Sequence, residues 1–486
     1  MTTKVEIVDT LRAMGLKAGD IVIVHSSLSS LGEVPGGAET VVDALLEAVG
    51  PDGTVVVPTF ATPDPVFNPE SSPTTLGAVA EALRRRPGAV RSLSPVASVA
   101  ALGPAAAEIC AGHDRTPTAH GEGTPYWRIA ERGGYVLLLG VDQDRNTMLH
   151  AAEEITRAAY LTPITANMSV HGEIRQVTYQ LFPGPHRDFI GLDKELRRRG
   201  IVRLGTIGRA RVRLMPARAL IEAVVELLRE NPAAVLCDNP ACEDCVRQRA
   251  LLRRSRLQQE TFVIAAQSQL AGMYPAEIAD RVARCGLDNL EVDLVLGRDL
   301  GRLTDGEFDS LRRELETRPL AVTSVRLRAV PDDLTLACQR ALLVGAKYLV
   351  MPSSAEADAL AAVQAAGLIP ALENVAMGVG EMGRRLLAAQ RFGTRCAFNP
   401  AEFARVGVKP FLQAYKRPVR KFVGLLYVCD ARFDGQPTAL ARGNGEIKEM
   451  ISILRAGGFT GPMVLCGVPG TLETCCGEFM NLLESL

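Results

Sequence analysis

The chain has 486 residues, a formal net charge of −1 and 22% charged residues. A balance so close to neutrality gives no electrostatic reason to expect binding to nucleic acid or to an anionic membrane. No apolar run reaches the ~18 residues of a membrane-spanning helix, and the first residues lack the apolar core of a signal peptide. The eleven cysteines are therefore expected to be reduced thiols of a cytoplasmic protein.

The first part of the chain alternates apolar strands with helices. Residues 21–24 and 54–57 predict buried strands, with a helix near 38–49 between them. This order indicates an α/β fold with a mainly parallel sheet flanked by helices. A hydroxyl-rich stretch, 25–32, follows the first strand, where such sheets tend to place ligands. Residues 61–76 are rich in Pro and Ser and predict a long loop.

A histidine and an acid follow the next predicted strand, 134–141. Asn146 or Thr147 can cap a helix on which His150 and Glu153, three residues apart, share one face. A carboxylate beside an imidazole fixes its tautomer and favours the imidazolium. Such a pair is the minimum equipment of a general base acting on an amine or hydroxyl. A surface pair without a role has the same spacing.

Five motifs occur in a fixed order along residues 1–235. They are His-Ser-Ser-Leu at 25–28, Gly-Thr-Val-Val-Val-Pro-Thr-Phe at 53–60, Ser-Val-Ala-Ala-Leu-Gly at 98–103, Gly-Glu-Gly-Thr-Pro-Tyr at 121–126 and Asn-Thr-Met-Leu-His-Ala-Ala-Glu at 146–153. Together they resemble the aminoglycoside 3-N-acetyltransferases, the antibiotic N-acetyltransferase family. The resemblance implies an enzyme that moves an acyl group, expected to be acetyl, from acyl-CoA to an amine of an aminoglycoside-like or other amino-containing small molecule.

The resemblance also implies roles for individual residues. His150 matches the general base that deprotonates the acceptor, and Glu153 matches the acid that follows it. One departure concerns the acceptor pocket, because the family often has a histidine where this chain has Ala97. His25 and His120 equally fit loop histidines that pack beside the cleft. The positions that match the acyl-CoA site are His25, Ser26, Ser27, Leu28 and Ser98.

The segment 233–256 connects the two halves and carries three closely spaced cysteines, Cys237, Cys242 and Cys245. Close thiols suggest zinc, but a structural zinc site usually takes four ligands. Only three are visible here, so a zinc-free cysteine-rich loop is the favoured alternative and no metal is expected. The arginines that follow are expected to form the solvated face of a connecting helix.

The second half repeats a strand–helix rhythm that predicts a TIM-like (β/α)8 barrel. The expected domains are therefore 1–250 and 257–486. The stretches 286–292, 369–374 and 443–447 resemble the xylose-isomerase-like barrels, a superfamily of sugar-phosphate isomerases, epimerases and endonuclease IV. The candidate strands are 262–266, 288–293, 322–327, 347–351, 369–373, 395–398, 422–428 and 462–466.

Enzymes of that superfamily usually hold a divalent metal with Glu, Asp and His at the strand ends. Here Glu373 matches one ligand, while Asn399 and Cys466 stand where acids are expected, and all six histidines lie at or before residue 186. The barrel is thus expected to be metal-poor. Its carboxylates, Glu291, Glu373 and Asp430, either grip a substrate or are internally satisfied.

Three functions stay open at this point. The first is an acyl-CoA-dependent N-acyltransferase whose partners are CoA and a small-molecule amine, with a barrel that recognises substrate, acts as a scaffold or dimerises. The second makes the barrel an isomerase or epimerase, against which the missing histidines argue. The third is a non-enzymatic binding protein for acyl-CoA or an amine, against which His150 and Glu153 argue.

Overall fold

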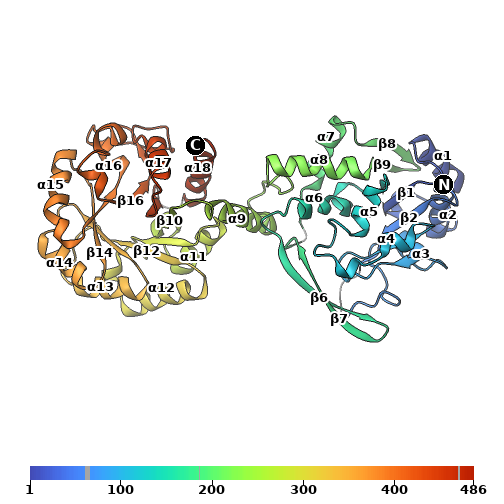
Figure 1. Ribbon diagram of the computed structural model, residues 1–486, viewed down its shortest axis with the longest axis horizontal. Coiled ribbons are helices and arrows are strands. Elements are labelled where there is room, and N and C mark those ends of the chain that lie inside the picture. Colours follow the sequence, from blue (N-terminus) through green and yellow to red (C-terminus); the bar gives the residue numbers. More distant parts are fainter. Residues whose placement is uncertain (61–65, 185, 469–470) are drawn as a thin grey trace. The chain divides into compact units, whose positions relative to one another are not determined.

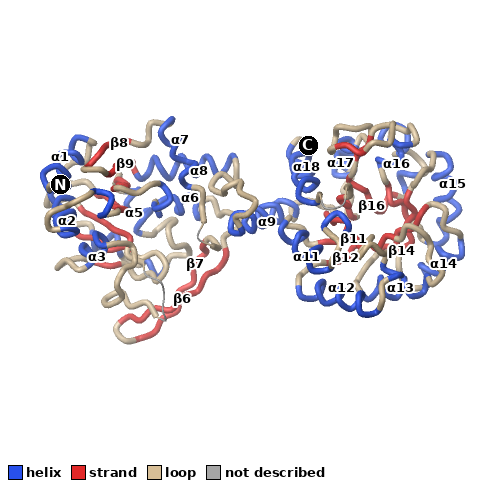
Figure 2. Tube along the Cα trace, turned by 180° about the vertical axis from the view of Figure 1, so that it is seen from behind, coloured by secondary structure: helices blue, strands red, loops and turns tan. Residues whose placement is uncertain are grey.

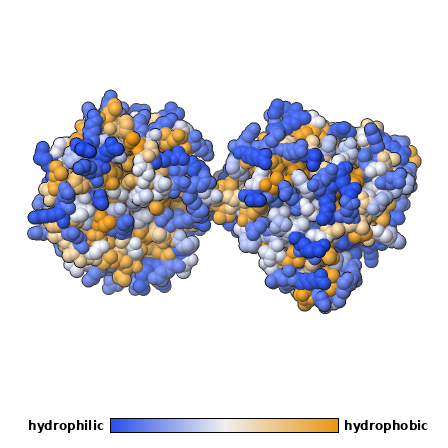
Figure 3. Space-filling view, viewed as in Figure 1, coloured by the Kyte–Doolittle hydropathy of each residue, from blue (hydrophilic) through white to orange (hydrophobic). Residues whose placement is uncertain are grey.

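The computed structural model describes residues 1–60, 66–184, 186–468 and 471–486. It divides into two compact units, Met1–Gln248 and Arg249–Leu486, each with its own core (Figure 1). The loop predicted for 61–76 begins with residues 61–65, which lie outside the described ranges. None of the described helices combines the length and apolar character needed to cross a membrane. Hydrophilic and hydrophobic residues are interspersed over the face shown in Figure 3.

The first unit is built on a seven-stranded sheet with the order β3-β4-β2-β1-β5-β9-β8. Only the three central strands are parallel: β1 pairs with β2 on one side and with β5 on the other. The strands are β1 (Ile21–Ser26), β2 (Thr54–Pro58), β3 (Val90–Arg91), β4 (Val99–Leu102), β5 (Tyr135–Leu139), β8 (Arg203–Ile207) and β9 (Ala210–Pro216).

The expectation of a mainly parallel sheet is wrong for the outer strands. The β3–β4, β2–β4, β5–β9 and β8–β9 pairs are all antiparallel, so the sheet is mixed. The β8–β9 and β3–β4 connections are too short for the helical crossover that parallel pairing requires. A separate antiparallel hairpin is formed by β6 (Thr162–Val170) and β7 (Glu173–Leu181).

Helices cover the sheet because their apolar residues recur at helical spacing. Helix α1 packs against α2 and α2 against α3, and they share one core with β1, β2 and β5. Helices α5 and α6 pack against α8, whose Leu220, Ile221 and Val224 are buried. The helices are α1 (Lys4–Ala13), α2 (Gly37–Val49), α3 (Ala78–Arg84), α4 (Ala106–Cys110), α5 (Pro125–Glu131), α6 (His150–Ile155), α7 (Phe189–Arg198) and α8 (Ala217–Glu230).

The second unit contains a closed barrel of eight parallel strands in chain order, so the eight predicted strands are confirmed. Figure 2 shows the strands inside a ring of helices. The strands are β10 (Val263–Gln267), β11 (Asn289–Val292), β12 (Ala321–Arg326), β13 (Tyr348–Pro352), β14 (Ile369–Glu373), β15 (Arg395–Phe398), β16 (Val423–Val428) and β19 (Pro462–Leu465).

One helix, α9 (Glu243–Leu257), spans the boundary between the units. Inside the barrel, Ala265, Val350, Leu425 and Val464 pack together, while a larger apolar cluster joins the outer faces of the strands to the helices. The barrel unit's other elements are α10 (Ser268–Ala271), α11 (Pro275–Arg284), α12 (Asp305–Thr317), α13 (Leu334–Leu343), α14 (Ala357–Ala365), α15 (Val379–Ala389), α16 (Pro400–Arg405), α17 (Ile447–Ala456), α18 (Leu472–Glu484) and the short β17 (Asp430–Ala431) and β18 (Pro437–Thr438).

Candidate functional site

The carboxyl ends of β1, β2 and β5 lie along one edge of the first sheet. Ser26 pairs with Leu139, and Pro58 pairs with Val99 at the start of β4. The polar residues that follow these strands therefore gather at this edge, as expected for a sheet with parallel central strands. Helix α6, with His150 as its first residue, also follows from β5.

His150 and Glu153 form the predicted pair. The Asn146 side chain accepts a hydrogen bond from the backbone N–H of Met148 and caps a single 3₁₀ turn that leads into α6. On the first turn of α6, His150 Nδ1 lies 2.6 Å from Glu153 Oε2. Since an ionised carboxylate only accepts, Nδ1 carries the hydrogen and Nε2 keeps a lone pair. The neutral imidazole is thus held in the tautomer of a base.

Glu153 is fully buried and has two further partners. The Tyr160 hydroxyl donates to Glu153 Oε1 at 2.7 Å, and Arg187 Nε donates to the same oxygen at 2.6 Å. Burial alone raises the pKa of Glu153, but the hydrogen bond from His150 and the charge of Arg187 outweigh it and hold the pKa at about 2. Glu153 is therefore a carboxylate throughout the physiological range.

Burial acts in the opposite sense on the histidine. It lowers the pKa of His150 below its ordinary value of 6.5, although the hydrogen bond to Glu153 works against that shift. At neutral pH the pair is thus a neutral imidazole beside an ionised carboxylate. This is the protonation state that a general base needs before it accepts a proton.

Aromatic rings enclose the imidazole. The Phe182 ring stacks on His150 with centroids 3.9 Å apart and planes 14° from parallel, and the Phe189 ring meets it at 4.9 Å and 61°. The Arg187 guanidinium lies over Phe182, 4.7 Å from the ring centroid. The segment 182–189 thereby contributes three side chains to the surroundings of His150 and Glu153, none of which the sequence motifs indicated.

A second histidine–glutamate pair lies beside the first. The His120 ring centroid is 5.1 Å from that of His150, and His120 Nδ1 is 2.9 Å from Glu154 Oε1. The backbone N–H groups of His120 and Gly121 both donate to Glu154 Oε2. His120 therefore lies beside His150, and its predicted place next to an acyl-CoA cleft stays a prediction. Its pairing with Glu154 was not anticipated, and the only sequence signal for it is the second acid directly after Glu153.

A cavity of about 550 Å³ opens next to this pair. Its lining includes Glu122, Glu154, Arg157 and Gln180, although the Glu154 side chain itself is fully buried against His120 and Gly121. An acid such as Glu122 in the lining favours a cationic ligand. The full lining is Pro117, Thr118, Glu122, Glu154, Ile155, Arg157, Ala158, Ala159, Leu161 and Gln180.

The hydroxyl-rich loop after β1 adjoins the loop that leads from β5 to His150. Gly140 follows β5 with φ +73°, and a Cβ there would lie 2.6 Å from Ser30 Cβ. Ser30 Oγ donates to Ser27 Oγ at 2.8 Å, and Ser27 Oγ lies 3.2 Å from Ser29 Oγ. These three hydroxyls carry three hydrogens and use two among themselves, so one remains for a ligand.

The remaining predicted acyl-CoA residues lie at the same edge. His25 is buried, its Nε2 has no partner among the described residues, and burial lowers its pKa to about 3. Ser98 is buried with its Oγ 3.4 Å from Thr59 Oγ1 at the end of β2. The carbonyl of Ala97 accepts the hydroxyl of Tyr126, whose ring is 4.8 Å from that of His120. Tyr126 thereby links the residue before Ser98 to His120.

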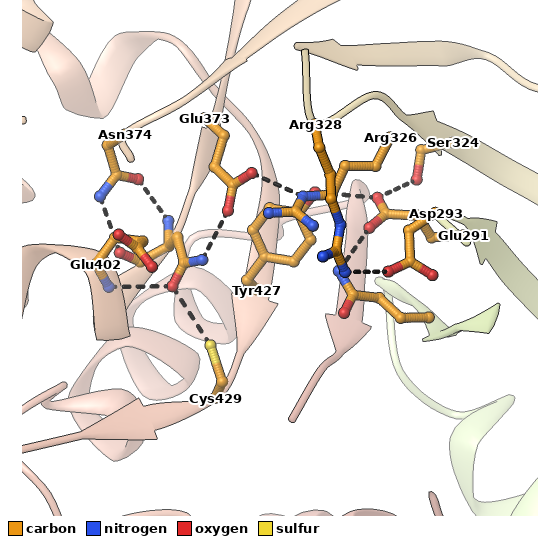
Figure 4. A network of polar contacts seen from close by, with 12 residues as sticks. Glu291, Asp293, Ser324, Arg326, Arg328, Glu373, Asn374, Glu402, Tyr427 and Cys429 are labelled. Atoms are coloured by element: carbon orange, nitrogen blue, oxygen red, sulfur yellow. Dashed lines mark hydrogen bonds and ion pairs between the residues drawn. The ribbon is translucent and has the colours of Figure 1, made fainter. Parts of the chain in front are cut away.

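A second polar site lies at the mouth of the barrel, around a cavity of about 750 Å³ (Figure 4). Arg326 Nε donates to Glu373 Oε2 at 2.7 Å, and Asn399 Nδ2 donates to Glu373 Oε1 at 2.8 Å. Glu291 accepts from Ser324 and Tyr427, and burial raises its pKa to about 7. Glu373, which matches one ligand position of the xylose-isomerase-like barrels, is thus engaged by a guanidinium and an amide of its own chain.

Asp430 is also internally satisfied. Its carboxylate accepts hydrogen bonds from the backbone N–H groups of Ala431, Gly443 and Gly445 at 2.7–2.9 Å. By accepting these three backbone hydrogen bonds, the Asp430 carboxylate holds the loop that contains Gly443 and Gly445 in place. Of the two alternatives for these acids, the structure favours internal satisfaction for Glu373 and Asp430.

Comparison with known proteins identifies the first unit. A model of the aminoglycoside 3-N-acetyltransferase family matches residues 23–229. Aminoglycoside N(3)-acetyltransferase IV of Salmonella sp is 33% identical over 236 residues, which are 48% of this chain and 90% of that protein. Aminoglycoside N(3)-acetyltransferase VII of Streptomyces paromomycinus is 34% identical over 266 residues, which cover 47% of this chain and 92% of that protein. A crystal structure of the aminoglycoside acetyltransferase AAC(3)-IVa, as apoenzyme, has 32% identity, 50% and 95% coverage and a TM-score of 0.47.

Relatives more than 30% identical are thus spanned almost completely by the first half of the chain. The chain belongs to the aminoglycoside 3-N-acetyltransferase family, and the resemblance found in its five motifs is confirmed for this half. The matched residues, 23–229, contain both histidine–glutamate pairs and the hydroxyl-rich loop.

Proposed function

We propose that the first unit transfers an acetyl group from acetyl-CoA to an amino group of an aminoglycoside-like molecule, with His150 as the general base. The single observation that carries this proposal is the buried His150–Glu153 pair in a chain of this family. The Phe182 ring stacks on the imidazole of that pair. The two histidine–glutamate pairs and the cavity beside them supply the parts that such a reaction needs.

The base solves a protonation problem. An alkyl amine is mostly protonated at neutral pH and cannot attack until it loses a proton. The ammonium form releases one proton to solvent, and in the proposed step His150 Nε2 accepts a second proton, from the neutral amine nitrogen, as that nitrogen bonds to the thioester carbonyl carbon. Glu153 then stabilises the imidazolium through Nδ1–H. When the tetrahedral intermediate breaks its C–S bond, the proton passes from His150 to the CoA thiolate, which restores the base.

The donor and the acceptor would approach from different sides. The hydroxyl chain of Ser27, Ser29 and Ser30 offers one free donor to acyl-CoA or to the developing oxyanion. Glu122 in the lining of the cavity suits an acceptor that carries several ammonium groups. Ala97 stands where the family often has a histidine, so the preferred acceptor is to be identified by comparing turnover of several amines.

Release of CoA by the full-length chain tests the proposal against a panel of aminoglycosides and simpler diamines. Acetyl-CoA with at least one polycationic acceptor should give turnover, and His150→Ala should lower kcat by roughly 10²–10⁴, the usual contribution of general acid–base catalysis. Binding of acetyl-CoA, followed by calorimetry, should be unchanged in that variant.

The matched control is His171→Ala. His171 is an exposed histidine at the tip of the β6–β7 hairpin, 3.7 Å from Glu70 and apart from the candidate site. It should turn over like the parent chain. Near-parental turnover by His150→Ala would remove the base from the proposal.

We further propose that the second unit is a TIM-like barrel related to the xylose-isomerase-like barrels that has lost their metal chemistry. The pairing of Glu373 with Arg326 supports this, because the guanidinium takes the place of a cation beside that carboxylate. The chain also has no imidazole after residue 186. A role in recognising substrate or in scaffolding fits a cavity whose acids are internally paired.

A further inference from the structure

The three cysteines of the connecting segment are joined in space by a histidine from a distant part of the chain. One ligand-type atom each of His186, Cys237, Cys242 and Cys245 lies within 4.8 Å of all the others. His186 Nδ1 is 3.3 Å from Cys245 Sγ and 3.4 Å from Cys242 Sγ. His186 precedes Cys245 by 59 positions, which is why the cysteine spacing alone showed only three ligands.

The two nitrogen–sulfur distances are close to those of a tetrahedral zinc site, and the remaining ligand atoms lie near enough to close around an ion. With Zn–N near 2.0–2.1 Å and Zn–S near 2.3 Å, a tetrahedron places N and S about 3.5 Å apart and two sulfurs about 3.8 Å apart. One imidazole and three thiols form a Cys₃His set, a common structural zinc set, and thiolates select soft or borderline metals such as zinc over magnesium or calcium. Four protein ligands leave no open position, so such a site is structural.

The ligands are held in place by the secondary structure around them. Cys242 directly precedes α9, and Cys245 is buried in its first turn. The segment bearing His186 docks on the same turn, since the His186 N–H donates to Asp244 Oδ2 at 3.2 Å and Gln248 Nε2 donates to the Pro183 carbonyl at 2.9 Å. The cluster is thus assembled by contacts that need no ion.

The segment that carries His186 also forms the enclosure of the candidate base. Phe182 stacks on His150, and Arg187, the residue after His186, donates to Glu153 and lies over Phe182. Fixing His186 to α9 therefore fixes the adjacent Arg187, which contacts both Glu153 and Phe182.

We propose that His186, Cys237, Cys242 and Cys245 bind one structural zinc ion that fixes His186 to α9 and thereby positions the adjacent Arg187 against Glu153 and Phe182. The ion joins two parts of the first unit that are distant in sequence. The metal site stands by itself, whereas its effect on the base rests on the proposed acetyl transfer.

Metal analysis of the full-length chain, purified without a metal-binding tag, tests the site directly. One zinc per chain is expected, and Cys242→Ser or His186→Ala should lose it. Cys429→Ser is the matched control, because Cys429 is also a partly buried free thiol but lies at the barrel mouth, and it should keep the zinc. A chain grown with zinc that contains no stoichiometric metal would overturn the site.

Replacement of zinc by cobalt gives a second, independent readout. Co²⁺ in a tetrahedral thiolate site should show visible d–d bands and a sulfur-to-metal charge-transfer band, and both should vanish in Cys242→Ser. A Cys242–Cys245 disulfide found by mass spectrometry in freshly purified, reduced-lysate protein would instead make the cluster a redox pair and refute zinc binding.

The positioning effect is measured by kinetics. Removal of zinc with a chelator should lower kcat by about 10²-fold, the cost of misplacing a catalytic group by about 1 Å, while KM for acetyl-CoA stays the same. Added zinc should restore kcat, and His186→Cys, which keeps four soft ligands, should hold zinc and retain activity where His186→Ala does not. Unchanged kcat after zinc loss would refute the positioning effect. If the intact chain acetylates nothing, the metal content and cobalt spectrum still decide the site.

Discussion

His150 is defined as a base by its neighbours more than by its own chemistry. Glu153 fixes its tautomer, Phe182 covers its ring, and burial keeps it neutral. Glu153 in turn has Tyr160 and Arg187 on its other oxygen, so the negative charge in the interior is paired. A buried carboxylate without such partners would be costly. The two residues thus depend on a network that reaches well beyond α6.

The pH dependence of turnover follows from these shifts. Because burial lowers the pKa of His150, the neutral base persists below pH 6.5 and is lost only when the pH falls through that lower value. The acidic limb of kcat should therefore lie below pH 6.5 at saturating acceptor. Glu153→Gln removes the interactions that raise the pKa of His150, so its limb should move to still lower pH while kcat falls.

A pH–rate series on both forms, with circular dichroism to confirm folding, measures this. The fold control matters because the Glu153→Gln substitution leaves the buried Arg187 without its counter-ion. An acidic limb well above pH 6.5 in the parent chain, or an unmoved limb in a folded Glu153→Gln, would contradict the assignment.

Among the elements, the loop after β1 and the loop after β5 are in direct contact. Gly140 allows Ser30 to approach closely, and the Ser27 N–H donates to the Leu139 carbonyl at 3.0 Å. The two loops would move together if either were displaced. The contact brings the hydroxyl-rich loop next to the loop that leads to His150 although more than a hundred residues separate Ser27 from Gly140.

A bulky side chain in the hydroxyl-rich loop should prevent acyl-CoA from binding. Ser27→Trp places a large ring where acyl-CoA is proposed to bind, so calorimetry should show no binding of CoA, with the fold intact by circular dichroism. Ser27→Ala is the matched control, since it removes the hydroxyl but adds no bulk and should keep measurable affinity. CoA affinity equal to that of the parent in a folded Ser27→Trp would place the cofactor elsewhere.

In the barrel, β12 and β14 are joined by the ion pair of Arg326 and Glu373. Both side chains are largely buried, at 17% and 4% exposure. Breaking such a pair leaves an uncompensated charge and should destabilise the barrel by about 3–5 kcal/mol, whereas replacing both partners by neutral groups should cost much less. Glu373→Gln and the double variant with Arg326→Met test this by urea unfolding.

Circular dichroism follows the barrel in this experiment, and Trp127, the one tryptophan of the sequence, reports the first unit by fluorescence. The destabilisation should appear in the dichroism transition and be largely absent from the double variant. Equal losses of unfolding free energy in the single and double variants would show that breaking the ion pair costs no more than replacing both of its partners.

At the scale of the whole molecule, the two units have separate cores, and the first contains more side chains with a proposed chemical role than the second. The first has a buried base, a cavity with two acids and a Cys₃His cluster. In the second, Glu373 and Asp430 are occupied by partners of the same chain. Catalysis is therefore expected to depend on the first unit alone.

The barrel should bind no catalytic metal. Full-length Cys242→Ser, which lacks the proposed zinc ligand, should contain no stoichiometric metal by elemental analysis, even after incubation with Mn²⁺ or Mg²⁺ and desalting. The reason is that a hard-cation site needs several free oxygen ligands, and Glu373 is already bound by Arg326 and Asn399. Stoichiometric Mn or Mg in that variant would revive the isomerase hypothesis.

Local chemistry let the sequence by itself determine a large part of this protein. The eight barrel strands follow from apolar runs separated by helices, the turn before α6 from Asn146, and the contact between His150 and Glu153 from their spacing. Strand patterns, caps and same-face pairs depend on residues a few positions apart, so they are legible along the chain.

Only the tertiary structure decided the contacts between distant segments. It made the sheet mixed, set Arg187 on Glu153, joined His120 to Glu154 and brought His186 to the three cysteines. It also showed that backbone amides satisfy Asp430. Each of these depends on how separate elements pack, and packing is set by the shapes and polar groups of many residues at once, which no local spacing in the sequence records.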